Sequence, residues 1–153
     1  MAIDEERLAT LRAGGSKEGC ALLAVMLQES RNGSEIYPYM RALLDMLDDA
    51  NSFVRTRALL LIAANARWDR DYLIDESLEA ILSHISDPRP ITSRQFIAAL
   101  PELAEAKPEL REEIIRALHD ARTESYASSM RPLVEKDIQN ALREISSQRE
   151  ETP

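Results

Sequence analysis

Residues 43–58 read Leu-Leu-Asp-Met-Leu-Asp-Asp-Ala-Asn-Ser-Phe-Val-Arg-Thr-Arg-Ala. The spaced leucines predict one amphipathic helix, the aspartates predict a turn, and the apolar run after them predicts a second helix. Residues 81–96, which begin 38 positions later, repeat this plan as Ile-Leu-Ser-His-Ile-Ser-Asp-Pro-Arg-Pro-Ile-Thr-Ser-Arg-Gln-Phe. Helix pairs repeated at this spacing are typical of a helical solenoid, in which neighbouring pairs stack to bury their apolar faces.

The composition supports an all-α fold. Hydrophobic residues make up 44% of the 153 residues but aromatics only 5%, and the abundant Leu, Ala and Ile favour helices over strands. No uncharged apolar run reaches about 18 residues, so we expect no transmembrane helix. The acidic first residues lack the apolar core of a secretory signal, so we expect a cytoplasmic protein. A single cysteine, Cys20, excludes a disulfide within the chain.

The charge distribution bears on the partner. The net charge is −8, yet residues 51–100 carry six basic and six acidic groups, so the acidic excess lies toward the two ends. An acidic protein is poorly suited to sequence-independent DNA binding, which depends on lysine and arginine contacts to phosphate. We therefore expect a protein or acidic peptide as partner, bound near the neutral middle of the chain.

The pattern predicts a right-handed α–α superhelix of four antiparallel helix pairs. We expect one domain over residues 1–146 and a flexible tail over 147–153. The predicted helices span residues 4–13, 17–30, 35–48, 51–66, 76–86, 92–105, 108–119 and 130–146. Asp75 and Thr92 are predicted to cap the fifth and sixth helices. Pro101 predicts a kink or a break within the sixth.

Asp49, followed by Val54-Arg55 and Ala58, resembles the HEAT-repeat pattern, in which the aspartate lies at the turn and the arginine begins the second helix. Several further stretches are similar to a group of small bacterial HEAT/ARM-like proteins, some of which carry a name borrowed from the Fe–S assembly scaffolds SufB and SufD. These stretches are 37–39, 64–69, 94–95, 98–103 and 130–138. The resemblance implies a concave surface built from the second helix of each pair. It does not transfer Fe–S chemistry, because Cys20 is the only thiol, and we expect no cofactor.

Four arginines lie at or near the start of the predicted second helices: Arg55, Arg57, Arg94 and Arg131. A cation there opposes the helix dipole at a cost of about 0.3–1 kcal/mol, so a compensating partner is expected. One interpretation is a ladder of arginine–aspartate contacts between repeats, using Asp48, Asp49 and Asp87. The other is that the arginines line the concave face and bind an acidic partner or phosphate. Both can hold for different arginines.

Two further residues stand out. Trp68, in a predicted loop, either packs against Tyr72 at the end of the fourth helix or is a binding hot spot, so we group it with the four arginines as partner-binding candidates. Cys20 is expected to be buried and unreactive on the apolar side of the second helix.

No pattern for catalysis stands out. His84 and His119 are 35 residues apart, which is not a metal-ligand spacing, and no phosphate loop or nucleophile elbow is present in the sequence. We therefore predict a non-catalytic, metal-free scaffold for protein–protein interaction. The alternative is a HEAT-like nucleic-acid-binding or DNA-base-repair protein of the alkylpurine glycosylase type, with Trp68 and Asp69 at its site. Self-association, with a second copy filling the groove, is left open.

Overall fold

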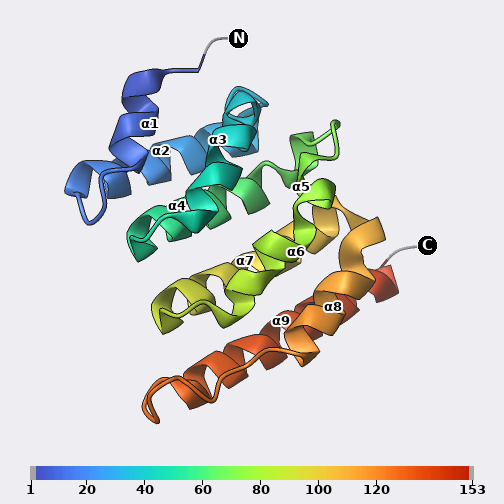
Figure 1. Ribbon diagram of the computed structural model, residues 1–153. Helices are drawn as coiled ribbons and strands as arrows, with labels where there is room; N and C mark the ends of the chain where they lie inside the picture. The colour runs from blue at the N-terminus through green and yellow to red at the C-terminus, as the bar shows by residue number, and fades with distance from the viewer. Residues whose placement is uncertain (1–2, 152–153) are drawn as a thin grey trace. The chain divides into compact units, whose positions relative to one another are not determined.

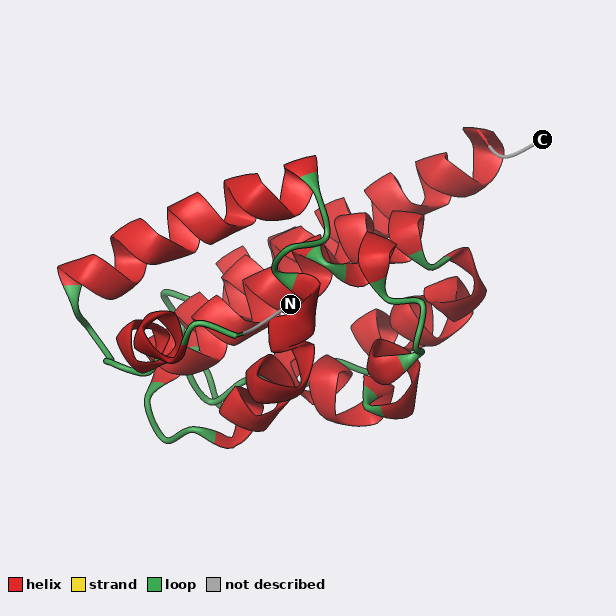
Figure 2. Cartoon of the chain, turned by 90° about the horizontal axis from the view of Figure 1, so that it is seen from above, coloured by secondary structure: helices red, strands yellow, loops and turns green. Residues whose placement is uncertain are grey.

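A computed structural model describes residues 3–151, and this part of the chain consists of helices and loops without a strand (Figures 1 and 2). The α-helices are α1 (Glu5–Leu11), α2 (Lys17–Asn32), α3 (Met40–Asp45), α4 (Ser52–Ala64), α5 (Leu73–Glu76), α6 (Leu78–Leu82), α7 (Pro90–Ala106), α8 (Arg111–His119) and α9 (Arg131–Glu151). Short 3-10 helices precede or follow several of them: η1 (Tyr37–Tyr39), η2 (Met46–Asp48), η3 (Ala66–Trp68), η4 (Ser83–Ser86) and η5 (Pro108–Leu110). The predicted all-α class is confirmed for the described residues.

The chain divides into two compact units, residues 1–81 (unit 1) and 82–153 (unit 2). Helix α9 continues to Glu151. It therefore includes residues 147–151 of the segment 147–153 that we expected to be a flexible tail. Residues 152 and 153 of that tail lie outside the described part of the chain. The single domain over residues 1–146 stays a prediction.

The 38-residue repeat recurs in the element boundaries. Helix α3 begins at Met40 and α6 begins at Leu78, while α4 begins at Ser52 and α7 at Pro90. Both intervals are 38 residues, the spacing between the two sequence motifs. The repeated pattern therefore produces the same order of elements in its two copies.

The turn between the two helices is also the same in both copies. Asp49 has φ −64° and ψ 141°, and Asp87 has φ −54° and ψ 142°. Each carboxylate accepts a hydrogen bond from the backbone N–H two residues further on, at 2.8 Å from Asn51 and 2.9 Å from Arg89. A carboxylate that accepts from the N–H two residues later stabilises a turn, which explains why the aspartate recurs at this position.

In unit 1, helices α2 and α4 run parallel. Gly19 of α2 lies against Arg57 of α4, and further along both helices Ser30 accepts a 3.0 Å hydrogen bond from the Nδ2 of Asn65. Helix α1 runs antiparallel to α2, and a 2.8 Å ion pair joins Arg7 to Glu29. Unit 1 thus places its two longest helices side by side in the same direction.

Arg57 fixes this arrangement. Its side chain is buried, and Nη1 donates hydrogen bonds to the carbonyl oxygens of Leu11 at 2.8 Å and Ala13 at 2.9 Å. These carbonyls lie at the carboxyl end of α1, where the helix dipole favours a positive charge. A side chain on Gly19 would place its Cβ 2.5 Å from the Cζ of Arg57, so only glycine leaves room for the guanidinium.

In unit 2, helices α7 and α9 also run parallel. Arg94 Nε donates to Asp137 at 2.6 Å, and Gln148 Nε2 donates to the carbonyl of Pro101 at 2.8 Å. The paired residue numbers rise together along both helices, which defines the parallel direction. Helix α8 runs antiparallel to α9, since Glu112 near its start pairs with Arg149 near the end of α9.

Three predicted helix details can be compared with the structure. Helix α7 begins at Pro90 rather than Thr92, because Pro90 suits a first helical position and Thr92 is buried inside the helix. The same helix continues through Pro101 without the predicted break, and the alternative of a kink there stays a prediction. At the start of α5 the Asp69 carboxylate accepts from the N–H groups of Leu73 and Ile74, and the predicted cap at Asp75, for the helix over 76–86, stays a prediction.

Cys20, which was expected to be buried, is exposed, and so is Phe53 of α4. Cys20 faces solvent, because Gly19 must face Arg57 and successive helical residues point about 100° apart. Phe53 is 56% exposed, because the buried residue Val54 fixes the rotation of α4 and turns Phe53 outward. The error at Cys20 is therefore one of helix rotation rather than of helix position.

Prediction for Gly19 and Arg57. The substitution Gly19→Ala should lower the free energy of unfolding by about 1–3 kcal/mol, because the methyl group overlaps the Arg57 guanidinium. In an Arg57→Ala background the same substitution should instead stabilise by about 0.4–1 kcal/mol, since alanine is then an unobstructed helical residue. Urea denaturation of the four proteins of this double-mutant cycle measures both effects. An equal penalty in both backgrounds would show that the two residues do not contact each other.

Candidate functional site

The five predicted partner-binding residues divide between the two units. Arg55, Arg57 and Trp68 belong to unit 1, while Arg94 and Arg131 belong to unit 2. The positions of their side chains differ widely, so we describe them separately.

Arg55 and Arg57 are buried, with only 9% and 2% of their surface exposed. Arg55 Nη1 donates to the carbonyls of Asp49 and Ala50 at 3.0 and 3.1 Å, and Arg57 binds the end of α1 as described above. These contacts give both guanidinium groups a structural role inside the protein. The predicted aspartate ladder through Asp48, Asp49 and Asp87 stays a prediction.

Trp68 is half-buried and fixed by its polar edge. Its Nε1 donates a 2.8 Å hydrogen bond to the carbonyl of Ser30 at the end of α2. Asn65, which is fully buried, joins the same helix end through the hydroxyl of Ser30. The tryptophan therefore anchors η3 on α2, and its predicted packing against Tyr72 stays a prediction.

Arg94 lies at a surface between α7 and α9. Its side chain is 37% exposed, and its hydrogen bond to Asp137 raises the pKa of the guanidinium, so the group keeps its charge at any physiological pH. Ile91, one turn before Arg94, is 60% exposed, and Leu133, one turn before Asp137, is 40% exposed. Because α7 and α9 run parallel, the exposed side chains of Ile91 and Leu133 both lie on the amino-terminal side of the ion pair between Arg94 and Asp137.

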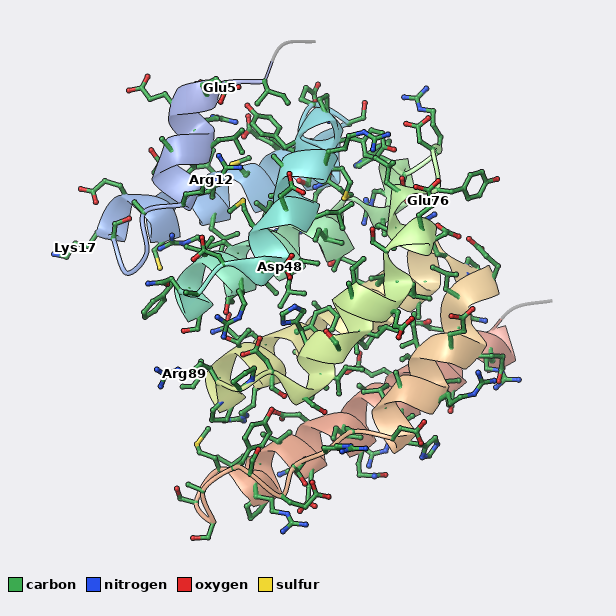
Figure 3. The ribbon with its side chains drawn as sticks, viewed as in Figure 1. Glu5, Arg12, Lys17, Asp48, Glu76 and Arg89 are labelled. Carbon is green, nitrogen blue, oxygen red and sulfur yellow. The ribbon has the colours of Figure 1, made fainter. Side chains whose placement is uncertain are left out.

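Lys136 completes this surface. It is exposed and lies three residues after Leu133, which places it on the neighbouring part of the same helix face. We call the set Ile91, Arg94, Leu133, Lys136 and Asp137 the α7–α9 face. Arg89 is exposed at the amino end of α7, next to this face, and is labelled in Figure 3.

Arg131 does not belong to the α7–α9 face. It lies two residues before Leu133, so its side chain points about 200° around the helix from Leu133. There it approaches Glu135, with 3.6 Å between Nε and Oε2, and remains 44% exposed. The structure therefore does not bring Arg131 together with Arg94. Sequence reasoning also missed Ile91, Leu133 and Lys136, since only their exposure distinguishes them from other helical residues.

A second polar cluster lies in unit 1, where the hydroxyl of Tyr37 lies 2.8 Å from carboxylate oxygens of both Asp69 and Asp71. Asp69 is buried and also accepts the two N–H groups that begin α5. Burial, followed by the hydrogen bonds to both carboxylates, raises the pKa of Tyr37 well above its ordinary value near 10. The phenol acts as a neutral donor that holds the loop between η3 and α5 in place.

The described residues include no group of three or more histidine, cysteine, aspartate or glutamate side chains placed to bind a metal ion. His84 Nδ1 lies 2.7 Å from Asp87 Oδ2, and His119 is exposed elsewhere in unit 2. Among the helices of residues 3–151, none is both long and apolar enough to cross a membrane.

Comparisons with protein-family models, with curated proteins and with solved structures give no match to this chain.

Prediction for Tyr37. Its raised pKa means that the folded state keeps the phenol proton at pH values where the unfolded chain loses it. The stabilisation from Tyr37 should be complete below pH about 10 and should decline as the pH rises further toward the folded-state pKa. The free energy of unfolding of the wild type should therefore fall more steeply above pH 10 than that of Tyr37→Phe. Parallel slopes for the two proteins in urea titrations from pH 8 to 11 would contradict this account.

Proposed function

We propose that this protein is a protein-interaction module that binds an acidic, partly aliphatic segment of another protein on the α7–α9 face. The observation that carries the proposal is the pair of exposed aliphatic side chains, Ile91 and Leu133, at the same end of two parallel helices. Basic groups border this pair. No reaction is proposed.

The aliphatic pair supports a binding role because both side chains would normally be buried. Ile91 is 60% and Leu133 is 40% exposed, although the surrounding helices bury most of their other large apolar residues. Neighbouring exposed apolar side chains with a polar border are typical of protein interaction sites. A partner that covers both would remove apolar surface from water.

The charges favour an acidic partner. Arg94 donates through Nε to Asp137, whose carboxylate holds the guanidinium near Ile91. Lys136 and Arg89 add two exposed cations near the aliphatic pair. Carboxylates on the partner can pair with these groups around an apolar centre, which is the usual arrangement of an interface with a polar rim.

We also propose that the helix pairs belong to a HEAT/ARM-like right-handed solenoid. The 38-residue repeat of helices and turns supports this, as do the parallel long helices within each unit. In such a fold the second helices form the concave, partner-binding surface. The α7–α9 face is formed by helices of this kind.

Prediction for the α7–α9 face. Peptides selected on the purified chain from a phage-displayed random library should combine aspartate or glutamate with leucine or isoleucine. Their affinity should fall at least about tenfold with Lys136→Glu and with Ile91→Ser, because each substitution removes a direct contact. Fluorescence anisotropy of a labelled selected peptide measures the change.

Two substitutions serve as matched controls. Arg131→Glu changes the charge of α9 by the same amount as Lys136→Glu but on the opposite flank of the helix, and it should leave the affinity unchanged. Val25→Ser alters a side chain that is 49% exposed in unit 1 and should also have no effect. Selection of basic peptides, or binding that is sensitive to Arg131→Glu and insensitive to Lys136→Glu, would refute the proposal.

A further inference from the structure

The charges of α7 are arranged against its helix dipole. A helix is stabilised by acidic side chains near its amino end and by basic side chains near its carboxyl end. Helix α7 has no acidic residue in its first turn and no basic residue in its last turn. Instead, the exposed Arg89 is its amino-terminal cap residue, and the exposed Glu105 lies in its last turn. The stability of the helix therefore does not account for the placement of these two charges.

The exposed surface continues from the α7–α9 face toward the carboxyl ends of both helices. On α7, Ala98 and Glu105 follow Ile91 by 7 and 14 residues, so all three point within about 40° of one direction. On α9, Glu144 follows Leu133 by 11 residues and points within about 20° of it. Ala98, Glu105 and Glu144 are all exposed. A partner that covers Ile91 and Leu133 can therefore extend along this surface.

This surface has one basic and one acidic end. Arg89 and Lys136 are the exposed cations near the aliphatic pair. Glu105 lies about 21 Å beyond Ile91 along α7, and Glu144 lies about 16 Å beyond the start of the face along α9, at a rise of about 1.5 Å per residue. Because α7 and α9 run parallel, their dipoles point the same way and increase the difference between the two ends (Figure 1).

Arg143 does not cancel the acidic end. It points about 120° away from Asp137, the α9 residue that faces α7, and it donates a 3.2 Å hydrogen bond to the side-chain oxygen of Asn140. Glu144 points within about 20° of Asp137. The side chains that follow the ion pair along the boundary of the two helices are thus carboxylates, with Glu105 on α7 and Glu144 on α9.

We propose that the segment bound on the α7–α9 face carries charges of both signs and binds in one direction. Its acidic, aliphatic part covers Ile91 and Leu133, and a basic part lies against Glu105 and Glu144. This inference rests on the proposed function and adds the direction of binding and a second charged group to it. Charge complementarity excludes the reverse direction, which would place carboxylates of the segment against Glu105 and Glu144. The distance between the two parts corresponds to about five or six residues of an extended chain.

The probe for this inference is the tightest-binding acidic, aliphatic peptide from the phage selection. Two longer forms add a Gly-Ser spacer of six residues and two lysines, at the carboxyl end of the peptide in one form and at the amino end in the other. A peptide bound in one direction brings only one of these extensions to Glu105 and Glu144. That form should bind at least about threefold more tightly than the other in fluorescence anisotropy. Equal affinities of the two forms would overturn the inference.

Charge reversal shows which carboxylates are responsible. The double variant Glu105→Lys/Glu144→Lys should abolish the difference between the two longer forms. Its affinity for the original peptide should stay within about twofold at 0.15 M salt, because charges beyond the Debye length are largely screened. The control variant Glu109→Lys/Glu113→Lys makes the same charge change at exposed positions of η5 and α8 and should keep the difference. Loss of the difference in both variants would indicate general attraction to an acidic protein and would overturn the inference.

A measurement of position separates this inference from the proposed function. A nitroxide label at the lysine end of the tighter form should broaden the amide NMR signals of Glu105 and Glu144 more than those of Ile91 and Leu133. The opposite pattern would overturn the direction of binding and leave the proposed function in place. A selected peptide that shifts no amide signal of the α7–α9 face would overturn both.

Discussion

In each unit one arginine fixes how two parallel helices lie against each other, and the character of the surface follows from that constraint. Arg57 packs against Gly19 and binds the carbonyls at the end of α1, so α2 can adopt only one rotation against α4. Arg94 binds Asp137, so α7 and α9 share one register. Once these rotations are set, Cys20 must face outward in unit 1, and Ile91 and Leu133 must lie at the same end of unit 2.

These two arginines satisfy their charge in different ways. Arg57 is almost fully buried and uses carbonyl oxygens at a helix end, where partial negative charge is already present. Arg94 is partly exposed and uses a carboxylate on the neighbouring helix. The first arrangement removes the guanidinium from the surface, whereas the second leaves it beside two exposed aliphatic side chains. Burial therefore decides which arginine of the sequence pattern is available to a partner.

Much of the fold could be predicted from local sequence signals. The 38-residue repeat recurs in the starts of α3, α4, α6 and α7. The errors arose where a distant residue decides the outcome. Cys20 was expected to be buried because its neighbours are apolar, but Arg57, 37 positions away, sets the rotation of its helix. The contact of Asp69 with the first N–H groups of α5 likewise requires the loop conformation that Tyr37 helps to hold.

The candidate site was harder to predict, for a related reason. Arginines near helix starts indicated a binding surface, yet Arg55 and Arg57 are internal and Arg131 lies on the other flank of α9. Ile91 and Leu133 resemble core residues in sequence, and only the packing of α7 and α9 exposes them.

Backbone amide NMR of the chain, titrated with an acidic peptide selected on it, tests the central claim most directly. The account predicts chemical-shift changes concentrated at Arg89 and at the residues of the α7–α9 face, which are Ile91, Arg94, Leu133, Lys136 and Asp137. Changes concentrated around Arg131 and Glu135, or in unit 1, would contradict it.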